Sequence, residues 1–225
     1  MAQRLKEDLN DLSLSSKYGF DKIWIYRDKI SKEKSGDYLQ KIVFSMSDYN
    51  KELDIQNKEA KDVIFMILLA NWIKDTYNLL LETYKKEIIR NYKRNDFSKE
   101  KDYLEAVRSF VVAHPMNTTR HKKFKLDGTY ICNDICIKDN YFFSFMKDDS
   151  IFYLDLDGLH EGKPRFKYDY LLKVYSSCDD MRFFKYICCS FDDITTCVSR
   201  YIDELYNLGL YLGSLKKRDF EGKSN

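Results

Sequence analysis

A mainly α-helical bundle with a small antiparallel β-sheet insertion is the fold class that the sequence predicts. Apolar side chains recur at helical spacing before residue 121 and again after residue 191. Between these stretches, apolar and polar residues alternate, as is typical of strands. We therefore expect a polar N-terminal arm at 1–19, a helical core at 20–121, a β-rich insertion at 122–191 and a C-terminal helix at 192–225 that packs on the core.

The composition predicts a soluble, cytoplasmic chain. The 225 residues fit one compact unit, and 38 basic against 36 acidic side chains leave a charge of only +2. Such a balance gives no global attraction to nucleic acid or to membranes. The charged N-terminus lacks the apolar core of a signal peptide, and the most apolar run, Val63 to Ile73, is too short to span a bilayer. We expect the six cysteines to be free thiols, mostly buried.

Three helices are predicted in the first half of the chain. A short helix near residues 20–30 is expected to end at Ser35-Gly36, and a second runs from Tyr38 to about Leu53. The segment 57–92 has the strongest helical periodicity and should be the central helix. It also carries a second apolar stripe, for which burial within the chain and contact with another element or subunit remain open. This stripe consists of Ile64, Leu68, Trp72 and Leu79.

The second half combines two further helices with strands. A fourth helix should begin at a Ser98 cap and end near His114, because Pro115 disfavours helical backbone in the residue before it. The last helix is preceded by Asp192 and Asp193 as candidate caps. Strands are predicted at 130–137, 141–146, 151–156 and 166–172, while 181–191 fits either a strand or a buried helix start.

The most informative segment, residues 103–115, holds an arginine and a histidine at a helix end. On a helical wheel, Arg108 lies at the border of one stripe, which consists of Tyr103, Val107, Phe110, Val111 and His114. We therefore expect His114 to be partly buried with Arg108 within reach. Because the two residues are roughly 120° apart around the helix axis, a second subunit would help to complete a site.

This pattern resembles the R-x4-6-H motif of the HEPN superfamily, whose helical members include prokaryotic RNases of toxin, abortive-infection and CRISPR-linked systems. The resemblance covers one helix and its helical context. It implies an RNA substrate, and a homodimer in which Arg108 and His114 of two copies form one composite catalytic site. It also implies an antitoxin or another defence-system partner. Ser109 stands where the family often has Asn, Asp or His, as the supporting residue.

The chemistry needs neither a metal nor a cofactor, because RNA carries its own nucleophile in the 2′-hydroxyl. His114 would transfer a proton and Arg108 would hold the phosphate oxygens. A basic run after the motif, consisting of Arg120, His121, Lys122 and Lys123, is the expected RNA-binding segment.

Two alternatives stand beside this reading. Arg108 and His114 are structural in a non-catalytic helical dimerisation or interaction module that binds protein or nucleic acid. Alternatively, Cys132 and Cys136 join His114 or His121 around zinc, but the C-x3-C spacing lacks the usual C-x2-C knuckle. The sequence therefore favours an endoribonuclease with no bound metal.

Overall fold

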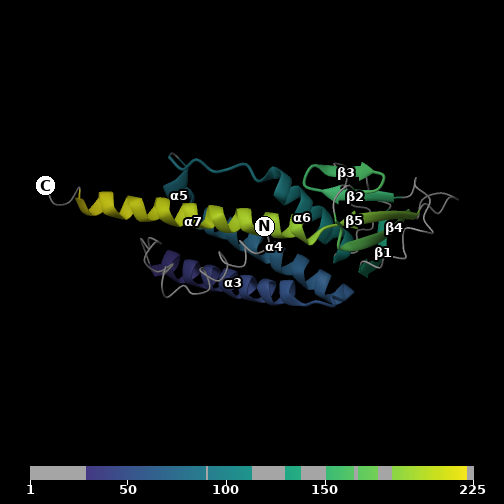
Figure 1. Ribbon diagram of the computed structural model, residues 1–225. Coiled ribbons are helices and arrows are strands. Elements are labelled where there is room, and N and C mark those ends of the chain that lie inside the picture. Colours follow the sequence, from purple (N-terminus) through teal and green to yellow (C-terminus); the bar gives the residue numbers. More distant parts are fainter. Residues whose placement is uncertain are drawn as a thin grey trace. The chain divides into compact units, whose positions relative to one another are not determined.

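A computed structural model describes residues 29–89, 91–112, 130–137, 151–164, 167–176 and 184–221 (Figure 1). These ranges are mainly helical and include one small sheet, which confirms the coarse fold class. The chain divides into two compact units. Unit 1 comprises Met1–Asp54, Trp72–Asp96 and Val198–Asn225, and unit 2 comprises Ile55–Asn71 and Phe97–Cys197. The four sequence-based domain boundaries stay a prediction.

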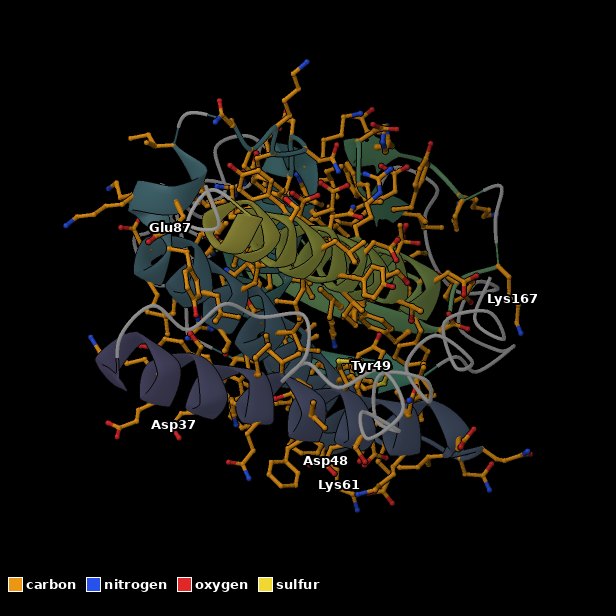
Figure 2. All side chains as sticks on the ribbon, turned by 90° about the vertical axis from the view of Figure 1, so that its left-hand side faces the viewer. Asp37, Asp48, Tyr49, Lys61, Glu87 and Lys167 are labelled. Carbon is orange, nitrogen blue, oxygen red and sulfur yellow. The ribbon has the colours of Figure 1, made fainter. Side chains whose placement is uncertain are left out.

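Unit 1 is built from α3 (Lys29–Asp54), the later part of α4 (Ala60–Thr83), α5 (Lys85–Ile88) and the later part of α7 (Phe191–Glu221). Its core is rich in tyrosine: Tyr49, Tyr77 and Tyr201 are almost fully buried. The rings of Tyr77 and Tyr201 meet edge to face with centroids 5.6 Å apart. Figure 2 shows Asp37 and Asp48 on the outer side of α3, whereas Tyr49 points inward.

Helix α3 runs without interruption through Ser35-Gly36, so the predicted break at this dipeptide is wrong. Ser35 is fully buried, and its hydroxyl is 2.7 Å from the hydroxyl of Tyr84. This buried hydrogen bond joins residues 49 positions apart, and it satisfies a serine that would otherwise favour a turn. The predicted short helix near 20–30 lies almost entirely outside the described residues.

The predicted central helix is confirmed as α4, followed by the short α5. Glu59 N–H donates to the Asp62 carboxylate at 2.7 Å, which satisfies one backbone donor at the start of α4. At Tyr84 the chain kinks, but the hydrogen bonds continue: Tyr84 N–H donates to Leu80 O, and Ile88 N–H donates to Tyr84 O. The periodicity of 57–92 therefore detected both helices and missed the kink.

Unit 2 contains a five-stranded sheet in the order β1-β4-β5-β2-β3 (Figure 1). Its strands are β1 (Tyr130–Ile137), β2 (Ile151–Asp155), β3 (Gly158–Glu161), β4 (Tyr170–Ser176) and β5 (Phe184–Cys189). β2 runs parallel to β5, whereas the other three pairings are antiparallel. The predicted antiparallel sheet is thus a mixed sheet, because alternation along a strand carries no information about the direction of its neighbour.

Two of the predicted strands agree closely with the structure. β1 has the predicted bounds, and β2 ends one residue before the predicted Leu156. β4 begins at Tyr170, four residues after the predicted start, and 181–191 contains a strand followed by the first residue of α7. The four-residue β3 was missed; it begins at Gly158, which has a φ of 144° that favours glycine. The predicted strand at 141–146 lies outside the described residues.

Helix α7 begins at Phe191, and its cap differs from the prediction. Asp192 and Asp193 lie inside the first turn, so neither is the cap. The hydroxyl of Ser190 accepts a hydrogen bond from Asp192 N–H at 3.0 Å, and the Asp169 carboxylate accepts one from Phe191 N–H at 2.9 Å. The second acceptor lies 22 residues away in the sequence, where local capping rules do not look.

Helix α4 is the one described helix that is long and apolar enough to cross a membrane by length and composition. This is weak evidence, because a buried core helix passes the same test, and 61% of its most apolar window is buried. The structure is therefore compatible with a soluble protein.

Candidate functional site

Helix α6 (Ser98–Val111) carries the arginine of the predicted motif within unit 2. Its inner face is formed by Tyr103, Val107 and Phe110, which are each at most 2% exposed, as the helical wheel predicted. Contacts between α6 and β1 hold the helix against the sheet. The predicted Ser98 cap is wrong: Phe97 is the N-cap residue, and no side chain caps this end.

Arg108 lies in the last turn of α6 and its side chain is exposed. Among the described residues it forms no ion pair or side-chain hydrogen bond. Its carbonyl accepts a hydrogen bond from Val112 N–H at 2.8 Å, which closes the helix end. The Arg108 side chain therefore leaves the last turn of α6 toward solvent, and no described residue occupies its planar set of donors.

The other half of the predicted pair, His114, lies outside the described residues, as do Arg120, His121, Lys122 and Lys123. The helix ends at Val111, three positions before His114. The composite arrangement of Arg108 and His114 stays a prediction, and so does the basic RNA-binding run.

Ser109, the predicted supporting residue, is only 4% exposed. It faces the interior of unit 2, whereas its neighbour Arg108 faces solvent, because successive helical residues point about 100° apart. Any support that Ser109 gives to Arg108 must therefore act through the helix backbone rather than by a shared hydrogen bond to substrate.

A group of carboxylates that sequence reasoning did not bring together lies where the sheet meets the start of α7; it consists of Asp155, Asp169, Asp192 and Asp193. Asp155 at the end of β2 accepts hydrogen bonds from the N–H groups of Asp157 and Gly158, and it is 3.0 Å from Nε2 of His160. The His160 ring stacks on Tyr153, with centroids 4.7 Å apart. Three separate segments supply these acids, so no motif in the sequence reveals them.

Asp193 is the member of this group with the most altered acidity. Burial, followed by the nearby carboxylates of Asp155, Asp192 and Asp169, raises its pKa to about 7. No trio of His, Cys, Asp or Glu in the described ranges is placed to hold a metal ion. The arrangement instead concentrates acidic charge around the first turn of α7.

The raised pKa of Asp193 predicts a pH-dependent stability. Between pH 4 and pH 7 the folded chain keeps a proton that the unfolded chain has released, so the free energy of unfolding should fall as the pH rises through this window. The full shift corresponds to about 4 kcal/mol, and solvent screening of this partly buried group reduces the expected fall to about 2 kcal/mol. Urea unfolding at pH 5 and pH 8 measures it.

Asp193→Asn should remove most of this pH-dependent fall, because the amide carries no charge at either pH. Asp192→Asn is the matched control: it removes an exposed charge from the same helical turn and should leave most of the fall in place. If the parent and Asp193→Asn lose the same stability between pH 5 and pH 8, the acid cluster is not the cause.

The five described cysteines are free, as predicted. Burial raises the pKa of Cys132 to about 11 and that of Cys188 to about 12, and it also raises the pKa of Cys136. Cys132 and Cys136 therefore stay protonated near neutral pH. A protonated thiol is a weak nucleophile, so these two residues on β1 are poorly suited to covalent catalysis.

Unit 1 contains a second polar cluster that the sequence did not indicate. Glu204 on α7 is 1% exposed, and its carboxylate accepts hydrogen bonds from the Tyr92 hydroxyl at 2.6 Å and from Asn95 Nδ2 at 2.7 Å. Burial and the Glu204 carboxylate raise the pKa of both Tyr92 and Tyr77, so their hydroxyls keep their protons. This cluster fixes the segment after α5 against α7.

No family model, no curated protein and no solved structure matches the chain. The functional argument therefore rests on the residues themselves.

Proposed function

We propose that the chain is a metal-independent endoribonuclease of HEPN type. Arg108 and His114 of two copies form its composite catalytic site in a homodimer. The observation that carries this proposal is the exposed Arg108, held on the last turn of a helix whose opposite face is buried. A structural arginine would be buried or ion-paired, whereas a phosphate-binding arginine needs its planar set of donors free.

The proposed reaction uses the 2′-hydroxyl of RNA as the nucleophile. One imidazole takes the proton from this hydroxyl or gives one to the departing 5′ oxygen, and Arg108 binds the phosphate oxygens whose charge rises in the transition state. The products are a 2′,3′-cyclic phosphate and a free 5′-hydroxyl. A position just after a helix C-terminus favours the charged imidazolium, which suits proton donation or phosphate binding.

The remaining parts of the proposal follow from the same resemblance. Arg120, His121, Lys122 and Lys123 guide the RNA backbone, and Ser109 supports the motif helix from within. The protein acts in the cytoplasm as a toxin or antiviral defence effector, with an antitoxin or another defence-system protein as partner.

The test is an RNA cleavage assay in EDTA with a mixed tRNA and single-stranded RNA substrate and matched DNA. We expect cleavage of RNA only, with cyclic phosphate ends, because DNA lacks the 2′-hydroxyl. RNA that stays intact at high protein concentration, with and without divalent metal, contradicts the proposal. Cleavage that requires metal contradicts the mechanism.

A second function, a non-catalytic helical interaction module, is favoured by one specific observation. Unit 1 exposes several large apolar side chains, among them Phe44 at 60%, Leu210 at 49% and Ile89 at 70%. The same RNA assay separates the two functions, because an interaction module binds a partner without cleaving RNA.

A further inference from the structure

The outer face of α4 carries apolar residues that the described residues cover only in part; at Trp72 the ammonium of Lys41 from α3 lies 3.5 Å from the ring centroid. Phe65, Leu68, Trp72 and Leu79 follow one another at intervals of three, four and seven residues. Trp72 is 38% exposed and Leu79 is 48% exposed, whereas Phe65 and Leu68 are half-buried. Alternating steps of three and four residues place these side chains on one stripe of a helix, as in helices that pack against a partner helix.

Charged residues continue the same stripe at both ends and in the middle. Lys61 lies near the start of α4, Asp75 in the middle and Glu82 near the end, and their side chains are 74%, 51% and 71% exposed. Figure 2 shows Lys61 at the outer surface. Lys61 and Glu82 have the exposed local partners Glu59 and Lys85, and such surface pairs cost little to exchange, whereas Asp75 pairs with the buried Lys74.

The distribution of charge along the stripe indicates which partner binds to this face of α4. Lys61 lies 11 positions before Trp72 and Glu82 lies 10 positions after it, so opposite charges flank the tryptophan almost symmetrically. An antiparallel second copy, related by a two-fold axis near Trp72, brings Lys61 of each copy beside Glu82 of the other. A parallel copy would instead place like charges together. A two-fold axis requires self-complementarity of this kind.

We infer that the outer face of α4 is a self-association surface on which a second copy of this chain docks antiparallel, with Trp72 at its centre. Tryptophan is enriched at the energetic centres of interfaces, and the flanking ion pairs fix the direction of the partner helix. A bilayer is the poorer occupant, because Lys61, Asp75 and Glu82 would be carried into it with the apolar residues. The inference goes beyond the proposed nuclease and holds whether or not the chain cleaves RNA.

The experiment measures the mass of the full chain by sedimentation over a range of concentrations. The parent should form a dimer of about twice 27.0 kDa. Lys61→Glu and Glu82→Lys should each raise the dimer Kd about tenfold or more, because each creates two like-charge contacts. The double variant restores both ion pairs and should return to within about threefold of the parent.

Mixing the two single variants gives a sharper test. One copy then carries acidic groups at both positions and the other carries basic groups at both, so all four flanking charges meet opposite partners. We expect heterodimers to form at concentrations where each variant alone is monomeric. In a parallel arrangement each single variant would dimerise like the parent, because positions 61 and 82 would still face like charges; that result would overturn the stated geometry.

Trp72→Ala should abolish the dimer, and Ile89→Ala is its control, since Ile89 is 70% exposed but lies outside α4. Circular dichroism shows whether each variant is folded. A parent that is monomeric throughout, or a dimer unaffected by both charge reversals, overturns the inference. Binding of the monomer to phosphatidylcholine vesicles would also overturn it, in favour of a membrane. RNA cleavage by a protein whose dimer is unaffected by both charge reversals would leave the proposed function standing on its own.

Discussion

Replacement of Arg108 or His114 by alanine should lower RNA cleavage in EDTA by about 100-fold or more. A positioned acid or base contributes about 10²- to 10⁴-fold to a proton-transfer reaction, and a donor aimed at developing charge contributes about 10²- to 10³-fold. Arg108→Lys should retain part of the activity, because lysine keeps the charge but loses the planar set of donors. Initial rates with a single-stranded RNA measure all three variants.

Two matched variants control this prediction. Lys101→Ala removes an exposed cation two turns earlier on the same face of α6, and His160→Ala removes a histidine from β3. Both should keep cleavage within about threefold of the parent, since neither belongs to the motif. Equal losses in Lys101→Ala and Arg108→Ala would reduce Arg108 to one part of a general attraction for RNA.

A mixing experiment tests whether two copies share one catalytic site. A mixture of Arg108→Ala and His114→Ala proteins should regain part of the cleavage activity, because their heterodimers hold one intact arginine and one intact histidine. A site contained within one copy gives no recovery on mixing.

The helices were predictable where burial is periodic. The apolar stripes of α4, α6 and α7 recur at helical spacing because each helix buries one face. Val107 and Phe110 were therefore assigned correctly to the buried face of α6 from the sequence alone. The continuity of α3 through Ser35-Gly36 was not predictable, because the buried Ser35 is hydrogen-bonded to Tyr84 across 49 positions. Local preference was overridden by a contact that no local window contains.

The candidate site likewise has one feature that local sequence predicted and one that it did not. The exposure of Arg108 followed from its place at the border of the α6 stripe, which is a local property. The raised pKa of Asp193 did not, because the neighbouring carboxylates come from β2, from the segment before β4 and from α7. The parallel pairing of β2 with β5 was equally hidden, since strand direction is set by chain topology.

Glu204→Ala should lower the free energy of unfolding by about 3 kcal/mol. The variant leaves the Tyr92 hydroxyl and the Asn95 amide without their carboxylate and opens a cavity at a position that is 1% exposed. Glu204→Gln should cost about half as much, because its carbonyl still accepts from Tyr92 while its amide faces the amide of Asn95. Urea unfolding at pH 7 provides the measurement.

Asn207→Ala is the matched control, since Asn207 is exposed one turn further along α7 and should change stability by less than about 0.5 kcal/mol. Tyr92→Phe combined with Glu204→Gln isolates the hydrogen bond of 2.6 Å, and the two changes should be non-additive by about 1 kcal/mol. Additive effects would mean that Glu204 stabilises the segment after α5 by packing alone. Non-additive effects make its buried carboxylate the group that fixes this segment to α7, a bond that spans 112 positions of the chain.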